Sequence, residues 1–290
     1  MIHIASIGEL RARLSTADQI GLVPTMGYLH AGHQSLIATA ARENPEVVVT
    51  LFVNPLQFAP GEDLAAYPRD LEGDAAKAEA AGATILFAPT VAEMYPRPVL
   101  TTVLVAEVSA RMEGASRPTH FAGVATVVAK LFAIAGPCRA YFGEKDFQQV
   151  AVVRRMAADL SMPVEVVACP TVREPDGLAL SSRNVYLSAA ERETAPILHR
   201  ALVAGAGLIA GGETDAEVVR GEMAALIDSA PLATRDYVEV ADPDSLEPLQ
   251  RCDDRARLFG AVQFGRARLI DNVGVPTRAA GTGGPTGDPA

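Results

Sequence analysis

The chain has 290 residues, of which 49% are hydrophobic, and a formal net charge of −10 at pH 7. That length can bury a large core and is sufficient for two domains. Because binding to a nucleic-acid backbone depends on clustered basic residues, the acidic composition argues against nucleic acid as a partner. The amino terminus lacks the pattern of a signal peptide, and we identify no apolar run long enough for a bilayer, so no membrane partner is expected.

The three cysteines, Cys138, Cys169 and Cys252, are odd in number and far apart in the sequence. They include no Cys-x-x-Cys pair, so neither a zinc site nor a disulfide framework is indicated. We expect buried thiols in a reducing cytoplasm.

Segments of strand and helix character alternate along the first 170 residues. In chain order we expect a strand over Gln19–Val23 and then a helix, a strand over Val47–Val53, a surface helix over Asp70–Ala81, a strand over Thr84–Ala88, a helix over Val124–Ala135, a strand over Arg139–Phe142, a helix over Phe147–Leu160 and a strand over Val164–Cys169. This alternation predicts an α/β fold with a Rossmann-like, doubly wound parallel sheet. Ligands of such sheets bind beyond the carboxyl ends of the strands.

The pattern changes near Thr171, which we take as the boundary between a first domain over 1–171 and a smaller α+β domain over 172–275. The second part predicts helices over Ala189–Ile209 and Asp215–Ala230, and strands over Tyr237–Val240, Ala256–Val262 and Ala267–Asn272. Residues 276–290 are rich in Gly, Pro and Thr, so we expect a disordered tail there.

Two histidines three residues apart, His30 and His33, follow the first predicted strand. A strand, a turn and a helix start are expected here, with both imidazoles on the first helical turn. Unpaired N–H groups and the helix dipole would make such a start a phosphate site, and Gly32 would allow close backbone approach. This favours a protein that handles a nucleoside triphosphate. Because the spacing also arises by chance, packed or surface histidines are the alternative.

The segment Phe142–Gln149 lies where a predicted strand gives way to a helix. Lys145 and Asp146 therefore fall at the carboxyl end of a strand, and Gln149 follows at helical spacing. A lysine there can neutralise a phosphate, and an aspartate can accept hydrogen bonds from ribose hydroxyls. The alternative is a solvated loop in which Asp146 caps the helix.

Two further polar segments could hold substrate groups. Leu180–Asn184 places hydroxyls beside Arg183, whose forked guanidinium suits phosphate oxygens, although an ordinary loop has the same composition. Asn54 and Gln57 directly follow a predicted buried strand. The Gln57 amide could hold a hydroxyl or carboxylate of a small substrate; the alternative is a plain turn.

Asp74 and His120 have ordinary interpretations beside functional ones. Asp74 lies in an acidic helix start, which could recruit Mg²⁺ but is typical of carboxylates that favour the helix dipole. His120 closes a polar stretch before a predicted helix, and we expect a structural hydrogen bond from it.

Some familiar motifs are missing from the sequence. There is no Gly-x-x-x-x-Gly-Lys-Ser/Thr phosphate loop and no Gly-x-Ser-x-Gly elbow. Gly205–Ala210 matches a loose dinucleotide pattern but falls late in a predicted helix. Because the sequence has no Gly-x-Ser-x-Gly elbow, we expect no covalent nucleophile from the protein.

Four motifs together resemble the pantoate–β-alanine ligase family. They are Pro-Thr-Met-Gly…His-x-Gly-His, Phe-Val-Asn-Pro-x-Gln-Phe, Phe-Gly-Glu-Lys-Asp and Asp-Gly-Leu-Ala-Leu-Ser-Ser-Arg-Asn, and the match extends to about Val275. The resemblance implies that pantoate attacks the α-phosphate of Mg-ATP to give pantoyl adenylate and pyrophosphate. The amine of β-alanine then releases AMP and forms pantothenate. It also implies a homodimer.

The resemblance assigns roles to individual residues. The implied ATP-binding residues are Met26, Gly27, Tyr28, Leu29, His30, Ala31, Gly32, His33, Gly143, Glu144, Lys145, Asp146, Val172, Leu180, Ser181, Ser182 and Arg183. The implied catalytic residues are His33, a proton donor in the family, with His30, Lys145, Arg183 and Ser181. Asn54, Gln57 and Gln149 are the implied contacts of pantoate and β-alanine, and Asp74 is the position linked to Mg²⁺. Tyr28, Ala31, Thr119 and Leu180 depart from the family pattern.

The sequence alone is also compatible with other functions. The His-x-Gly-His element alone indicates only the wider nucleotidyltransferase superfamily, so another small acid could be the substrate. A non-catalytic nucleotide-binding protein is a further alternative, against which the intact His30, His33, Lys145 and Arg183 argue. An aminoacyl-tRNA synthetase is disfavoured by the acidic composition.

Overall fold

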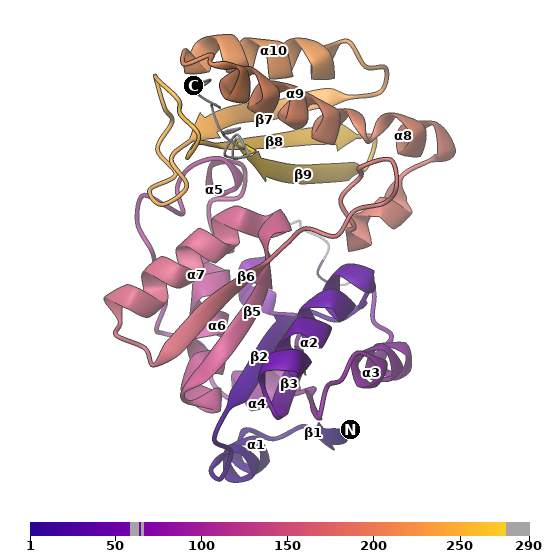
Figure 1. Ribbon diagram of the computed structural model, residues 1–290. Coiled ribbons are helices and arrows are strands. Elements are labelled where there is room, and N and C mark those ends of the chain that lie inside the picture. The colour runs from indigo at the N-terminus through magenta and orange to yellow at the C-terminus, as the bar shows by residue number, and fades with distance from the viewer. Residues whose placement is uncertain (59–63, 65–66, 277–290) are drawn as a thin grey trace, which may run out of the picture.

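Two β-sheets, each with its own helices, make up the structure (Figure 1). The computed structural model describes residues 1–58, 64 and 67–276. In the larger sheet all neighbouring strands are parallel, in the order β1-β4-β3-β2-β5-β6. Its strands are β1 (Ile2–Ile4), β2 (Ile20–Thr25), β3 (Glu46–Leu51), β4 (Ile85–Phe87), β5 (Cys138–Gly143) and β6 (Val164–Cys169). The predicted α/β fold with a doubly wound parallel sheet is confirmed.

Helices cover both faces of this sheet. The helices of this part of the chain are α1 (Ile7–Leu14), α2 (Ala31–Glu43), α3 (Leu71–Ala80), α4 (Val91–Met94), α5 (Glu113–Ser116), α6 (His120–Ala135) and α7 (Phe147–Asp159), with 3-10 turns η1 (Pro55–Gln57) and η2 (Glu144–Asp146). Of these, α5 lies against the second sheet (Figure 1). Successive side chains of a strand point to opposite faces. In β2, Leu22 therefore joins the core formed with α1, α6 and α7, whereas Val23 joins the core formed with α2 and α3.

The order of the strands reverses beside β2. Strand β3 pairs with β2 on one side, and the chain returns later to place β5 on the other side. The turn after β2 and the turn η2 after β5 therefore flank the switch point of the sheet, where ligands of open α/β sheets bind. These two turns carry the histidine pair and Lys145.

The second sheet is antiparallel, with the order β7-β8-β9. Its strands are β7 (Thr234–Ala241), β8 (Arg257–Phe264) and β9 (Ala267–Gly274). Its helical elements are η3 (Ser182–Tyr186), α8 (Ala189–Thr194), α9 (Ile197–Gly211) and α10 (Ala216–Asp228). A separate core that includes Leu202, Met223 and Leu258 joins α9 and α10 to this sheet. The predicted tail falls almost wholly on 277–290, outside the described residues.

One prediction about the helices of this region was wrong. The helix expected over Ala189–Ile209 is interrupted before Ile197, because Pro196 lacks a backbone N–H and favours a helix start. By length and composition alone, Ala189–Gly211 could cross a membrane, with a mean hydropathy of 1.2 in its most apolar window. Half of that window is buried within the protein, where α9 packs in the second core.

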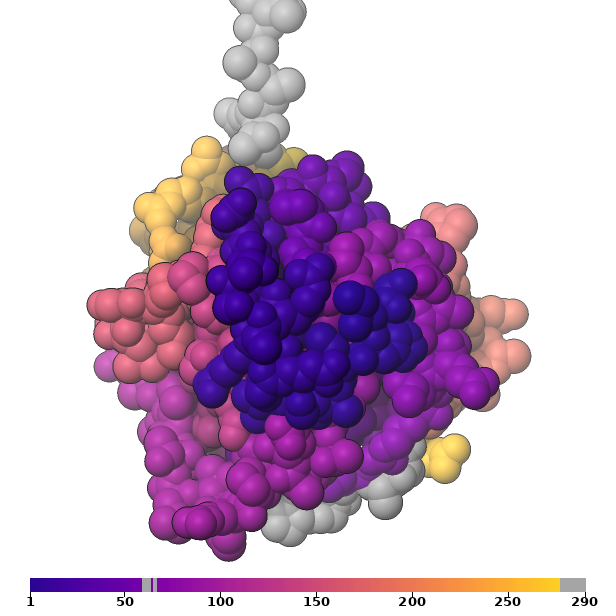
Figure 2. Space-filling view, turned by 90° about the horizontal axis from the view of Figure 1, so that it is seen from below, coloured from indigo at the N-terminus to yellow at the C-terminus, as the bar shows by residue number. Residues whose placement is uncertain are grey.

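The first elements of the chain were not predicted. Strand β1 pairs with the edge strand β4, and α1 packs beside α6. They lie at the end of the molecule opposite the second sheet, and the amino-terminal residues cover the middle of that face (Figure 2). This end is remote from the carboxyl ends of the strands.

Candidate active site

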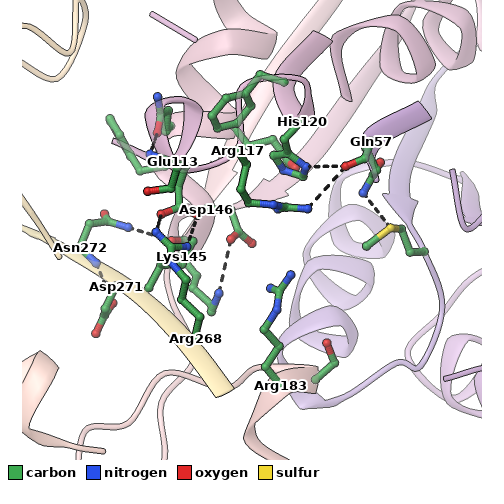
Figure 3. A pocket seen from close by; sticks show the side chains of 18 of the residues that line it. Gln57, Glu113, Arg117, His120, Lys145, Asp146, Arg183, Arg268, Asp271 and Asn272 are labelled. Atoms are coloured by element: carbon green, nitrogen blue, oxygen red, sulfur yellow. Dashed lines mark hydrogen bonds and ion pairs between the residues drawn. The ribbon is translucent and has the colours of Figure 1, made fainter. Parts of the chain in front are cut away.

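A cavity of about 450 Å³ lies between the carboxyl edge of the larger sheet and strand β9 (Figure 3). It brings together seven of the predicted site residues, from four separate segments of the chain. They are Met26, Gln57, Lys145, Asp146, Gln149, Ser182 and Arg183. The remaining predicted residues lie outside its lining, and their contacts show what each can do.

The histidines flank the cavity at the start of α2. His30 is the N-cap residue of α2, and its ring lies 4.1 Å from that of His33, centre to centre. Nδ1 of His30 accepts from the N–H of Gly32 at 3.1 Å, and Nδ1 of His33 accepts from the N–H of His30 at 3.3 Å. A neutral imidazole whose Nδ1 accepts carries its proton on Nε2. This network therefore assigns each ring an Nε2–H donor.

Five backbone N–H groups of this turn have partners within the protein, whereas the sequence predicted free donors there. The N–H groups of Tyr28 and Leu29 donate to the Asp74 carboxylate at 2.7 and 2.6 Å, and that of Gly27 donates to Oγ1 of Thr25 at 3.2 Å. Those of His30 and Gly32 donate to the imidazoles. These five N–H groups are therefore engaged within the protein, and the ring Nε2 atoms supply two further polar hydrogens for a ligand.

Asp74 is an anchor for the turn rather than an evident metal ligand. It is 2% exposed, and each of its oxygens accepts from a backbone N–H. This holds Tyr28 at a φ of 54°, in the left-handed region that bulky side chains rarely adopt. Within residues 1–58, 64 and 67–276 there is no group of three His, Cys, Asp or Glu side chains able to hold a metal ion. The geometry thus gives no support to a metal role for Asp74.

Both histidines are neutral in the free protein. Burial, and next the neighbouring His30 ring, lower the pKa of His33 to about 3. Burial and the charge of Lys145 also lower the pKa of His30. At neutral pH each ring can therefore donate a hydrogen bond to an anion, but neither holds an imidazolium proton to transfer.

The depressed pKa of His33 predicts a specific pH dependence of stability. Folding keeps this ring neutral, so its contribution is complete above the unfolded-state pKa of about 6.5 and is lost as the pH falls from there to about 3. The slope is about 1.4 kcal/mol per pH unit for one proton. Urea unfolding between pH 4 and 6 should show a shallower slope in His33→Gln than in the parent. Equal slopes would contradict the pKa.

Gly32 is required by the fold of the turn itself. A Cβ at Gly32 would lie 2.9 Å from two atoms of the His30 ring, closer than real side chains come. It would also lie 4.0 Å from Cβ of Leu180, which brings the loop after β6 next to the histidine turn. The glycine therefore lets His30 fold back over α2 beside that loop.

Lys145 and Asp146 lie on η2, at the carboxyl end of β5. The Lys145 side chain is 15% exposed, and its Nζ lies 3.4 Å from Oδ1 of Asp146 (Figure 3). Although burial acts to raise the pKa of Asp146, the charges of Lys145 and Arg183 leave it below its usual value. The three side chains share the cavity, so a negatively charged ligand would meet two cations here.

Other residues expected to bind ATP also make supporting contacts within the protein. Glu144 forms an ion pair with Arg257 on β8 at 3.2 Å, so its carboxylate is engaged between the sheets. Oγ of Ser181 accepts from the N–H of Arg183 at 3.2 Å and thus shapes the turn that carries the guanidinium. Val172 accepts the N–H of Leu180 through its carbonyl at 3.0 Å. These three residues hold the loops around the cavity.

Gln57 faces the cavity and is held from several directions. Its Nε2 donates to Sδ of Met26 at 2.8 Å, and its Oε1 accepts from Nδ2 of Asn54 at 3.3 Å. Nδ1 of His120 lies 3.1 Å from the Gln57 carbonyl oxygen, which confirms the structural hydrogen bond expected there (Figure 3). Asn54 is 1% exposed, and Tyr95 donates to its Oδ1 at 2.9 Å. This geometry makes Asn54 a support for Gln57.

A largely buried ion pair that sequence analysis missed joins α5 to the second sheet at the cavity. Arg268 on β9 donates to both carboxylate oxygens of Glu113 at 2.7 Å, and Tyr237 donates to the same carboxylate at 3.0 Å. Because Glu113 and Arg268 are 155 residues apart, no local pattern connects them. Glu113 and Arg268 both line the cavity, on the side away from Gln57 (Figure 3).

Comparisons with known proteins relate the chain to one family. A family model described as pantoate-beta-alanine ligase matches residues 2–274. A pantothenate synthetase from Roseiflexus castenholzii is 56% identical over 270 residues, covering 93% of this chain and 97% of the relative. A Thermus thermophilus pantothenate synthetase structure is 53% identical with a TM-score of 0.91, covering 95% of this chain and 99% of the other.

A Francisella tularensis pantoate-beta-alanine ligase has been solved in complex with beta-gamma ATP and beta-alanine. It is 33% identical, with a TM-score of 0.76, and the match covers 94% of this chain and 97% of the other. These matches span nearly the full length of both proteins. The chain therefore belongs to the pantoate–β-alanine ligase family.

Proposed function

We propose that the chain joins pantoate to β-alanine at this cavity, using Mg-ATP and passing through pantoyl adenylate. The observation that carries the assignment is the meeting of two turns beside the switch point. The charge of Lys145 lies close enough to the histidine turn to lower the pKa of His30, and Lys145 itself lines the cavity. Membership of the ligase family and the ATP and β-alanine complex of the Francisella protein support it.

In the first step a carboxylate oxygen of pantoate attacks the α-phosphorus of ATP, and the bond to the β-phosphate breaks to release pyrophosphate. Such displacements depend on alignment and charge neutralisation more than on a protein nucleophile. We assign His30 and His33 as neutral donors to phosphate oxygens through Nε2–H, and Lys145 and Arg183 as cations beside them. Mg²⁺ arrives with the triphosphate as part of the substrate.

In the second step the neutral amine of β-alanine attacks the activated carbonyl and loses a proton, and the carbon–oxygen bond breaks to release AMP. We assign Gln57 and Gln149 to the hydroxyls and carboxylate of pantoate. Their amides would be left unpaired by analogues that lack those groups, which favours the correct acid.

Transfer of an oxygen atom tests the intermediate directly. One carboxylate oxygen of pantoate leaves with AMP in this scheme, so ¹⁸O-labelled pantoate should yield labelled AMP, as measured by mass spectrometry. If β-alanine instead attacked an acyl phosphate, the label would appear in phosphate. Unlabelled AMP would exclude the adenylate. A different small acid that alone supports AMP release would favour the wider nucleotidyltransferase reading.

The division at Thr171 into domains over 1–171 and 172–275 is part of the proposal, with the second unit closing over the adenylate. Arg173, just past the boundary, binds Asp271 on β9 through two bonds of 2.6 and 2.9 Å. This ties the loop of Ser181 and Arg183 to the second sheet. Scattering profiles that do not become more compact with Mg-ATP and pantoate would argue against closure.

We also propose a cytoplasmic homodimer. The three cysteines are free and buried, as expected for a reducing compartment; cell fractionation tests that location. The leucines of an extended surface segment, Leu100 and Leu104, are 95% and 68% exposed, which is typical of an interaction surface. The double variant Leu100→Asp/Leu104→Asp should sediment as a monomer while the parent sediments as a dimer. A dimeric double variant would remove this segment from the interface.

A further inference from the structure

The turn that carries Lys145 is held by the second sheet. Asn272 on β9 is 3% exposed, and its Nδ2 donates to the carbonyl oxygens of Glu144 at 2.8 Å and Lys145 at 2.9 Å (Figure 3). Its Oδ1 accepts from Nε of Arg257 on β8 at 2.6 Å. Both amide hydrogens and the amide oxygen are therefore engaged, which fixes the orientation of the group.

The two carbonyls bound by Asn272 belong to the peptide groups on either side of the Lys145 Cα. Because each peptide group is planar, fixing both leaves little freedom in the two backbone dihedrals of Lys145. Those dihedrals set the direction in which the side chain leaves the turn. Asn272 thus acts on the residue whose ammonium faces the cavity, although its own amide is directed at the backbone.

Arg257 secures the same turn from a second direction. Its Nη2 lies 3.2 Å from the Glu144 carboxylate, and its guanidinium lies 3.7 Å from the centre of the Phe147 ring at the start of α7. A contact made only to dock the second sheet on the rest of the chain would need no such convergence, and the Arg268–Glu113 pair already joins the second sheet to α5. The convergence on η2 indicates a role in placing Lys145.

We propose that Asn272 is a positioning residue for the adenylation step, which aims the Lys145 ammonium by clamping the peptide groups around it, with Arg257 orienting the amide. The inference rests on the proposed function. It makes the second sheet a structural part of the phosphate site.

Asn272→Asp tests the clamp with little change in shape. The carboxylate can still accept from Arg257 but cannot donate to the two carbonyls. Pyrophosphate release dependent on pantoate, measured in the first turnover without β-alanine, should slow about 100-fold, the scale of a 1 Å misplacement. The KM for ATP should change much less than this rate.

Asn44→Asp is the matched control. Asn44 is 5% exposed at the far end of α2 from His30, and its Nδ2 donates to Ala40 and Tyr141. The same change there should lower the melting temperature while the rate of pyrophosphate release stays at the parent level. A comparable rate loss in both variants would show a general structural effect and overturn the proposal.

A double variant separates positioning from other roles. If Asn272 acts through Lys145, adding Asn272→Asp to Lys145→Met should slow the reaction no further. A full additional loss, or a folded Asn272→Asp enzyme at the parent rate, would overturn the proposal. Should Asn272→Asp fail to fold, Arg257→Met serves the same test, since it frees the amide while keeping an apolar stem on Phe147. Failure of the proposed function would differ, because the parent itself would then release no pyrophosphate with pantoate.

Discussion

Replacement of His33 by alanine is expected to lower kcat/KM for pantoate-dependent AMP release by about 10²–10³-fold, or about 2.7–4 kcal/mol, the usual effect of losing one placed donor. The ring carries its proton on Nε2, because its Nδ1 accepts from the His30 backbone. Its pKa of about 3 means that this donor is neutral at working pH.

His33→Gln sharpens the test, because a glutamine amide can present an N–H at a similar reach while carrying no titratable proton. It should retain much more activity than His33→Ala if hydrogen bonding is the function. The exposed His3, on β1, gives a control whose alanine variant should match the parent. Equal losses in His33→Ala and His33→Gln would instead favour proton transfer by the imidazole.

Lys145→Met should have the larger effect, a loss of about 10³-fold or more in kcat, the scale of a cation that stabilises phosphoryl transfer. Methionine keeps the apolar stem in the cavity and removes the charge, so the fold should be unaffected. Rates of the first turnover measure the step directly. Lys145→Arg keeps the charge with another shape and should recover part of the rate. A Lys145→Met enzyme within tenfold of the parent would exclude this residue from the phosphate site.

The sequence predicts those parts of the site that follow directly from strands. Val164–Cys169 matches β6 in full, because a β-branched run bounded by a turn is a local signal. Lys145 and Gln57 were expected beyond the carboxyl ends of β5 and β3, and both reach the cavity. The order of the motifs then identified the family, which no composition or periodicity could have done.

Local sequence patterns do not show which residue each polar group contacts. Asp74 looks like any acidic residue at a helix start, and only the fold shows that its carboxylate holds the turn of Tyr28. Asn272 reads as the end of a strand, yet it reaches the backbone of Lys145, 127 residues away. Such contacts depend on how elements far apart in the sequence pack together, so they had to come from the structure.

The requirement for both acids is the most direct test of the proposed function. AMP release from Mg-ATP should be measured with pantoate and β-alanine together, and with each omitted in turn. We expect steady AMP release only when both acids are present. Pyrophosphate should form in the first turnover when pantoate alone is added. Steady AMP release without pantoate, or none with both acids in protein that binds ATP, would contradict the assignment of this cavity to pantoate activation.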